Sequence, residues 1–387
     1  MPRLELTTAG ESHGPALVAV LVGVPAGLDL DVARVDATLA RRQRGYGRGA
    51  RMAIESDRVE VLSGLRRGRT LGSPIALRIA NRDASIDELP PVTRPRPGHA
   101  DLAGMLKYGT RDARDVLERA SARETAARVA GGAVASQVLE ALGVRVVGYL
   151  RSLGPVDAGD VPCDLDEVVS RRDASPFLCP DAATTAAMTA AVDAAREAGD
   201  TLGGVVEVVA RGMPPGVGGF ALPEHRLDGR LGAALLRIQA MKAVEIGLGL
   251  AAARLRGSEV HDGILPDAAR GTRRATNRAG GIEGGLTTGE DVVVRAAMKP
   301  LSTLRRALAS VDAVTGEAVA ATVERSDVCA APAASVVAEA AVALVLADAL
   351  LEKSGGDSME EVLRNVGAYR RACDALVGPP PPAGPAG

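Results

Sequence analysis

Two histidines stand in glycine-bounded loops, where an imidazole is well placed for proton transfer. His13 lies in the segment 10–14 (Gly-Glu-Ser-His-Gly), and His99 lies in the segment 96–101 (Arg-Pro-Gly-His-Ala-Asp). Glycine lets a backbone approach a ligand closely, and an imidazole exchanges protons near neutral pH. The chain has four histidines, and we expect structural roles for the other two. His13 and His99 are therefore the candidate acid–base residues.

Arginine positions indicate an anionic ligand. Five arginines and three glycines fall within 41–51, and two more arginines stand just before His99. Guanidinium groups pair bidentately with carboxylates and phosphates. Arg119 and Arg123 lie four residues apart in a predicted helix, so they require an anion or a carboxylate such as Glu124 nearby. We interpret these groups as a pocket for a ligand with several negative charges; a solvated or RNA-contacting basic loop is the alternative.

Composition argues against that alternative. The 387 residues carry a net charge of −2 and include six aromatic residues and no Trp, whereas RNA-binding modules stack bases on aromatic side chains. The 46 basic residues include only four lysines, which leaves 42 arginines; high genomic GC content also explains such a total. We predict a protein that binds no nucleic acid.

The spacing of the cysteines and the hydropathy of the chain indicate the cellular compartment of the protein. The four cysteines form no C-x-x-C motif, which favours a reducing compartment and no metal site. The first residues lack the apolar core of a signal peptide. The apolar stretch 330–351 contains Pro332, Glu339 and Asp348, so we expect a buried helix and not a membrane span. A cytoplasmic location follows as our expectation.

One motif points to a different chemistry. The segment 10–14 reads G-x-S-x-G, the nucleophile elbow of α/β-hydrolases. Ser12 would then be a nucleophile, with a later Asp and His225 or His261 as partners. Only one predicted strand, 3–8, precedes it, although an elbow follows several strands of a parallel sheet. A serine hydrolase is thus the alternative function.

Periodicity predicts a mixed α/β chain without an internal linker. We expect one domain over 1–377 and a disordered Pro/Gly-rich tail over 378–387. Gly131 and Gly132 each disfavour a helix by ~1 kcal/mol relative to Ala, so we expect very close packing there. The predicted helices cover 112–143, 181–198, 228–246 and 335–353, a last helix opens on a capping box at 358–361, and the predicted strands cover 144–150, 205–210 and 292–297.

Together the motifs closely resemble the chorismate synthase family. The resemblance implies an α+β fold, a β-α-β sandwich in which two antiparallel sheets enclose a central layer of helices, and a homotetramer. It implies a lyase that eliminates phosphate from 5-enolpyruvylshikimate 3-phosphate by 1,4-anti elimination, giving chorismate, with reduced FMN required and no net redox change. The matching segments are 10–14, 41–52, 94–108, 119–125, 200–207, 239–247, 276–285, 299–303 and 325–330.

The same resemblance implies roles for individual residues. His13 would protonate or stabilise the leaving phosphate, His99 would stand beside flavin N1 and hold the anionic flavin, and Asp327 would relay the proton taken by flavin N5. FMN contacts carry over to Arg119, Ala120, Ser121, Gln239, Ala240, Gly284 or Gly285, Lys299, Pro300, Leu301, Ser302, Thr303 and Arg325. Substrate or NADP contacts carry over to Arg42, Arg48, Arg51, Arg96 and Arg123, and NADPH is a candidate reductant of the flavin.

The chain departs from the family in one place. Relatives commonly carry a longer, Trp-containing segment before the Arg-Pro-Gly-His motif, whereas 81–93 is short and has no Trp. We interpret it as a trimmed surface loop, so coverage of the flavin or a subunit contact is expected to differ there.

Overall fold

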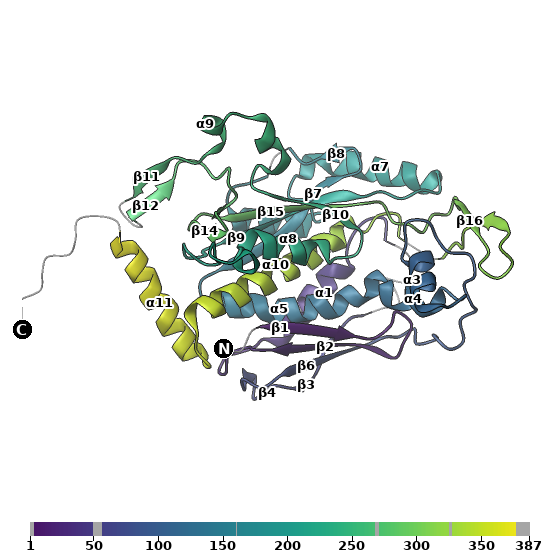
Figure 1. Ribbon diagram of the computed structural model, residues 1–387, viewed down its shortest axis with the longest axis horizontal. Helices are drawn as coiled ribbons and strands as arrows, with labels where there is room; N and C mark the ends of the chain where they lie inside the picture. The colour runs from purple at the N-terminus through teal and green to yellow at the C-terminus, as the bar shows by residue number, and fades with distance from the viewer. Residues whose placement is uncertain (1–3, 49–55, 160, 268–270, 325–326, 377–387) are drawn as a thin grey trace, which may run out of the picture.

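The computed structural model describes residues 4–48, 56–159, 161–267, 271–324 and 327–376. Arg51, Arg325 and the expected tail over 378–387 lie outside these ranges. Two antiparallel sheets form the outer layers (Figure 1). The first has the order β1 (Glu5–Ala9), β2 (Ala16–Val22), β6 (Ile75–Ala80), β3 (Glu60–Ser63), and the second β10 (Met241–Ile246), β15 (Val292–Met298), β9 (Gly204–Arg211), β7 (Arg145–Leu153), β8 (Val156–Asp157).

Helices α1 (Val32–Gln43), α5 (Thr125–Ala141) and α10 (Ala331–Ser354) lie in the layer between the sheets (Figure 1). Helix α5 packs on β1, β2 and β6, while α10 packs on β7 and β9. Side chains alternate between buried and half-buried along β2 and β15, as period-two strands with one face on a core do. The expected β-α-β sandwich is confirmed.

Close packing between the central helices depends on small residues. A Cβ at Gly132 of α5 would lie 2.3 Å from the Cβ of Ala340 in α10, and one at Gly131 would lie 2.7 Å from Leu6 Cδ1 of β1. The prediction of very close packing at this glycine pair is confirmed. Helix α10 is long and apolar enough to cross a membrane, but 83% of its most apolar 18-residue window is buried inside the structure, as expected of a core helix.

The prediction of one continuous helix over 112–143 is wrong. It divides into α4 (Arg114–Ala120), a 3₁₀ turn η1 (Ala122–Glu124) and α5, with Ser121 extended between them at φ −60° and ψ 143°. Ser121 Oγ accepts a hydrogen bond from the backbone N–H of Arg123, so the serine caps the next turn. Arg119 and Arg123 consequently do not share a helix face.

The helix predicted over 228–246 forms only in its first half, and the second half is a strand. Helix α8 (Leu227–Leu236) ends early, and the chain turns through Ala240 at φ +67° into β10. Pairing of β10 with β15 satisfies its backbone groups, and this tertiary pairing outweighs the helical pattern of the sequence.

The other predicted elements are confirmed within a few residues. Helix α7 (Thr185–Glu197) and helix α11 (Met359–Leu376) form, and Glu361 N–H donates to Ser358 Oγ while Glu361 Oε2 accepts from Ser358 N–H. Helix α3 (Asp101–Tyr108) lies with α4 at one end of the sandwich, and α11 lies at the other (Figure 1). The remaining elements are β4 (Leu65–Arg66), β5 (Arg69–Thr70), α6 (Leu165–Ala174), η2 (Ala182–Thr184), η3 (Pro223–His225), η4 (Gly249–Arg254), α9 (Gly257–Val260), β11 (Ile264–Asp267), β12 (Gly271–Arg274), β13 (Ile282–Glu283), β14 (Leu286–Thr287), β16 (Ala309–Val311) and β17 (Ala318–Ala320).

Candidate active site

His13 is held by a buried carboxylate. It lies in the loop between β1 and β2, and its Nδ1 is 2.9 Å from each oxygen of Glu118 in α4. The His13 backbone N–H also donates to Glu118 Oε2 at 2.9 Å. Burial alone would raise the pKa of Glu118, but the hydrogen bonds from His13 and from Arg114 lower it below its ordinary value. The ionised carboxylate thus keeps a proton on Nδ1, and Nε2, which lies 3.9 Å from Asp83 Oδ2, is the nitrogen for proton transfer.

His99 has a similar arrangement. Its Nδ1 hydrogen-bonds Oδ1 of the fully buried Asp101, the first residue of α3. Arg96 donates to Asp101 from Nε at 2.8 Å and from its backbone N–H at 3.0 Å. Burial would raise the pKa of Asp101, but the hydrogen bonds from His99 and Arg96 hold it well below its ordinary value. Although Arg96 Nη2 is 3.1 Å from His99 Nδ1, the contact with an ionised carboxylate requires the proton to be on Nδ1.

The third expected catalytic residue, Asp327, lies beside an arginine. Arg48 Nη1 is 2.8 Å from Asp327 Oδ2. Behind this pair, Arg42 and Arg123 share the buried Asp57: Arg123 Nη1 donates to Asp57 Oδ1 at 2.6 Å, and Arg42 Nη1 is 3.4 Å from Oδ2. Burial lowers the pKa of Arg42 to about 10, because desolvation outweighs the attraction of Asp57. Three guanidinium groups and two carboxylates leave this cluster with one net positive charge.

The arginines of 41–51 do not all face one ligand, contrary to expectation. Arg41 pairs with Glu339 of α10, and Arg44 Nη2 donates to the backbone oxygen of Asp173. Only Arg42 and Arg48, among the described arginines of this segment, join the cluster around Asp57 and Asp327. Consecutive residues at the end of α1 point to different faces of the helix, which separates Arg41 from Arg42.

Several residues that hold the candidate site together were missed from the sequence. Asn81 Nδ2 donates to Gly14 O at 2.7 Å and to Glu11 O at 3.1 Å, and its Oδ1 accepts from Arg123 Nε at 3.0 Å. Asn81 therefore joins the His13 loop to the arginine cluster. Asp101 had a visible signal, a carboxylate two residues after His99. Glu118, Asp57 and Asn81 had none, because their partners are distant in the chain.

The short 81–93 segment contacts the His13 loop. The backbone N–H of Ile86 donates to His13 O at 3.0 Å, and Asn81 N–H donates to Pro15 O at 3.2 Å. The segment that we expected to be a trimmed surface loop therefore packs directly on this part of the site.

Ser12 does not form a nucleophile elbow. It lies between two antiparallel strands, whereas an elbow lies between a parallel strand and a helix. Ser12 is buried, its Oγ accepts a hydrogen bond from Ser121 Oγ at 3.2 Å, and its backbone N–H donates to Glu118 O. The geometry does not support the serine hydrolase alternative.

Expected cofactor residues gather around Glu124 and Lys299. Glu124 Oε1 lies 3.6 Å from Arg119 Nη2, so the expected carboxylate is near Arg119, although Arg119 and Arg123 do not share a helix face. Glu124 Oε2 accepts from Gln239 Nε2 at 3.2 Å. The Ala240 oxygen accepts from Lys299 N–H at 3.0 Å. Thr303 Oγ1 accepts from Arg96 Nη1 at 2.9 Å, which connects this group to His99.

These residues leave unsatisfied polar groups that suit a ligand. Gln239 Oε1 is buried, and it has no hydrogen-bond partner among the described residues. Burial and the nearby Lys242 lower the pKa of the Lys299 ammonium. Lys299 Nζ donates to Pro300 O at 3.5 Å, and no carboxylate adds to the charges that act on it within the described ranges. A ligand with an N–H donor and a phosphate complements both features.

Gly284 and Gly285 do not lie near the other expected cofactor residues around Glu124 and Lys299. They form the turn between β13 and β14, at φ +60° and +90°. This turn lies toward the Val292 end of β15, and Lys299 follows its other end (Figure 1). Seven residues of strand at ~3.3 Å each place the two ends about 20 Å apart. A Cβ at Gly284 would contact nothing within 4 Å, so the turn is open on that side.

Comparisons with known proteins agree on one family. A sequence model of the family described as chorismate synthase matches residues 4–351. The chorismate synthase of Symbiobacterium thermophilum is 57% identical over 380 residues, covering 94% of this chain and 97% of its own length. That of Salinispora tropica is 54% identical, with 97% and 99% covered. A crystal structure of a chorismate synthase matches with a TM-score of 0.81 at 42% identity, covering 96% of this chain and 98% of that one.

Proposed function

The chain belongs to the chorismate synthase family, and we propose that it is a lyase that eliminates phosphate from 5-enolpyruvylshikimate 3-phosphate, giving chorismate, with reduced FMN as its cofactor. The observation that carries the proposal is the pair of imidazoles, each held at Nδ1 by a buried carboxylate and each next to arginine-rich segments. The 1,4-anti geometry and the absence of net redox change belong to the same proposal.

Arg48 is the proposed substrate contact that the described residues support best, whereas Arg96, also a proposed contact, is buried and bonded to Asp101 and Thr303. The substrate carries one phosphate and two carboxylates, and guanidinium groups bind such anions bidentately. Arg42 and Arg123 are buried and bonded to Asp57, so we propose that they contribute positive charge and hold the site together. Arg51 remains a proposed contact outside the described residues, and NADP is the alternative ligand for Arg42 and Arg48.

His13 is the proposed acid for the leaving phosphate. Glu118 holds the proton on Nδ1, so Nε2 is the nitrogen that would donate a proton to a phosphate oxygen. The ionised Glu118 stabilises the imidazolium before the transfer, because opposite charges attract strongly at a buried site. The phosphate then leaves as a protonated anion, which is more stable than the unprotonated anion would be.

FMN fits the group around Gln239 and Lys299. The buried Gln239 Oε1 is an acceptor for an N–H of the ring, and the Lys299 ammonium is a partner for the phosphate. Reduced FMN, when bound, supplies electron density to the substrate during elimination. The residues proposed to hold it are Arg119, Ala120, Ser121, Gln239, Ala240, Lys299, Pro300, Leu301, Ser302 and Thr303, with Arg325 outside the described residues.

His99 and Asp327 have proposed roles beside the cofactor. A protonated His99, held by Asp101, would place a positive charge where negative charge must be stabilised. The Asp327 carboxylate, next to Arg48, is the proposed proton relay.

We further propose a cytoplasmic homotetramer. Gly284 and Gly285 lie about one β-strand away from Lys299 in the same chain, so a role in FMN binding would require contact across a subunit interface. Sedimentation analysis, with and without FMN, tests the assembly.

The decisive experiment is an anaerobic assay. Protein, reduced FMN and 5-enolpyruvylshikimate 3-phosphate are mixed, and chorismate absorbance is followed. We expect product only when all three are present, and no product under these conditions would contradict the proposal. Replacing reduced FMN with oxidised FMN and NADPH then distinguishes an enzyme that reduces its own flavin from one that needs an external reductant.

A further inference from the structure

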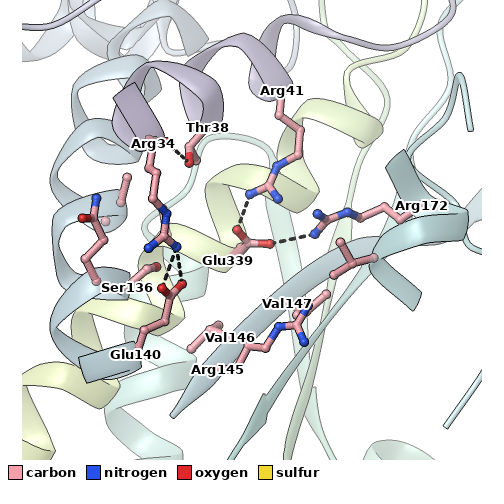
Figure 2. Close-up of a pocket in the computed structure, with 15 residues that line it drawn as sticks. Arg34, Thr38, Arg41, Ser136, Glu140, Arg145, Val146, Val147, Arg172 and Glu339 are labelled. Carbon is pink, nitrogen blue, oxygen red and sulfur yellow. Dashed lines mark hydrogen bonds and ion pairs between the residues drawn. The ribbon is translucent and has the colours of Figure 1, made fainter. Parts of the chain in front are cut away.

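Glu339 of α10 is a buried carboxylate that joins three other elements of the fold. It pairs with Arg41 of α1 and with Arg172 of α6 in the wall of a cavity (Figure 2), and its Oε2 accepts from the Gly148 N–H of β7 at 2.7 Å. Breaking a buried ion pair is strongly destabilising, because it leaves a charge without a counter-charge away from water. Glu339 therefore fixes the end of α1 relative to the second sheet.

Arg41 stands just before the segment that carries the proposed substrate contact Arg48. Helix α1 ends at Gln43, and residues 44–48 follow it directly. The Arg41 side chain faces α10, and in the ranges that the structure describes Glu339 is the carboxylate that pairs with it. The Arg41–Glu339 pair thus sets the point from which segment 44–48 leaves α1.

Segment 44–48 lies antiparallel to the start of α10 and the residues just before it. The contacts between them move toward the N-terminus of α10 as the segment advances. In chain order they are Arg41 with Glu339, Gly45 with Pro332, Gly47 with Val328, and Arg48 with Asp327. The two in the middle are uncharged: a Cβ at Gly45 would lie 3.2 Å from Pro332 Cβ, and Gly47 O accepts from the Val328 N–H at 2.9 Å. Ion pairs therefore hold the two ends of this contact.

The ion pair at the far end cannot keep this register by itself. Asp327 is the proposed proton relay, so its charge changes during the reaction, and Arg48 is proposed to bind the anionic substrate. The attraction of Asp327 for Arg48 is lost while the carboxylate is protonated. Arg41 and Glu339 are not among the proposed substrate or cofactor contacts, so the charges of their pair stay the same throughout.

We propose that the Arg41–Glu339 pair positions Arg48 for substrate binding. Glu339 holds Arg41, and with it the end of α1, against α10, and segment 44–48 then places Arg48 beside Asp327. Both members of the pair are positioning residues, which act through Arg48 and touch no reacting atom. The effect on substrate binding rests on the proposed function, whereas the effect on the position of segment 44–48 does not.

Arg41→Gln in the full-length protein tests this role in the chorismate assay. We expect the substrate KM to rise about tenfold with kcat within about twofold of wild type, because a displaced Arg48 loses binding that the ground state and the transition state share. Arg41→Lys keeps the charge beside Glu339 but not the planar fork, so we expect a smaller rise of about threefold. Glu339 itself is left in place, because its loss would also remove the partner of Arg172 and of the Gly148 N–H.

Arg230→Gln is the matched control. Arg230 of α8 also pairs with a carboxylate of α10, Asp348, and each side chain of that pair is 12% exposed, against 17% for Arg41 and 10% for Glu339. This pair lies outside segment 44–48 and its contacts. Arg230→Gln is therefore expected to lose stability like Arg41→Gln while the substrate KM stays at its wild-type value.

Hydrogen–deuterium exchange gives a readout that needs no substrate. The Tyr46 N–H donates to Pro176 O at 2.9 Å, and the Val328 N–H donates to Gly47 O. Both amides exchange slowly while segment 44–48 is in place. We expect faster exchange at both in Arg41→Gln, a smaller increase in Arg41→Lys, and wild-type exchange in Arg230→Gln.

Three results would overturn the inference. The first is wild-type exchange at Tyr46 and Val328 in Arg41→Gln or, if a thermal melt shows that this variant is unfolded, in Arg41→Lys. The second is faster exchange with an unchanged KM, which would mean that the segment moves without affecting Arg48. The third is an equal rise of KM in Arg230→Gln, since general destabilisation would then explain it. A wild-type protein that forms no chorismate contradicts the proposed function, and the exchange contrast between Arg41→Gln and Arg230→Gln still decides whether the pair positions the segment.

Discussion

The Nδ1 atom of His13 lies 2.9 Å from both carboxylate oxygens of Glu118, 105 residues further along the chain. The same carboxylate accepts the His13 backbone N–H. Glu118 therefore fixes the ring, its tautomer and the loop that carries it. His99 and Asp101 repeat this relationship within two residues of each other. Both candidate acid–base residues present Nε2 as the reactive nitrogen.

Glu118→Gln is expected to lower kcat by about 10–100-fold, because the imidazolium loses its counter-charge while the hydrogen bond to the ring is retained in part. The substrate KM is expected to stay near its wild-type value, because Glu118 is proposed to act on the substrate only through His13. Glu352→Gln, at an exposed carboxylate paired with Arg230, is the control. Equal losses in kcat and in thermal stability, with KM raised as well, would show that the carboxylate is only structural.

His13→Ala and His99→Ala are each expected to reduce turnover by roughly 10–1000-fold, the range for a lost proton transfer or lost electrostatic stabilisation. The anaerobic chorismate assay measures both. His261→Ala, at an exposed position beside α9, should retain the wild-type rate. Near wild-type rates for both active-site variants would remove them from the catalytic assignment.

Asp101→Asn is expected to lower the free energy of unfolding by about 3–5 kcal/mol at pH 7, because it breaks a buried ion pair with Arg96. The folded-state pKa of Asp101 is below its unfolded value of ~3.9. Its contribution is therefore present above about pH 4 and is lost as the pH falls through the folded pKa.

Urea denaturation of wild type and Asp101→Asn from pH 7 to pH 3 measures this dependence. The difference between the two proteins is expected to shrink below about pH 4. Asp166→Asn, at an exposed carboxylate, changes stability by no more than about 0.5 kcal/mol. A constant difference across the whole range would contradict the role of the ionised Asp101.

Gly132→Ala is expected to destabilise the fold by about 1–3 kcal/mol through overpacking, since the new methyl group would lie 2.3 Å from Ala340 Cβ. Gly229→Ala in α8 is the opposite case. No atom lies within 4 Å of a Cβ at Gly229, so Ala there stabilises the helix by up to ~1 kcal/mol. Thermal unfolding of both variants measures the contrast, and equal effects would show that α5 and α10 adjust freely.

Local patterns in the sequence determined much of the fold. The apolar length of α10, the strand at β15 and the capping pair Ser358 and Glu361 depend on residues close in the chain. The same holds for the two histidine loops, since glycine, histidine and arginine stand within a few positions of one another. The motif resemblance covered nearly the whole chain, and the family match confirmed it.

Only the tertiary structure decided the rest. Ser121 interrupts a helical pattern, and residues 241–246 form a strand because β15 supplies their hydrogen-bond partners. Glu118 reaches His13 because α4 packs beside the β1–β2 loop. Arg41 turns away from Arg42 toward Glu339. Each outcome depends on contacts between segments far apart in the sequence, whose free energies exceed the local preferences that a sequence pattern expresses.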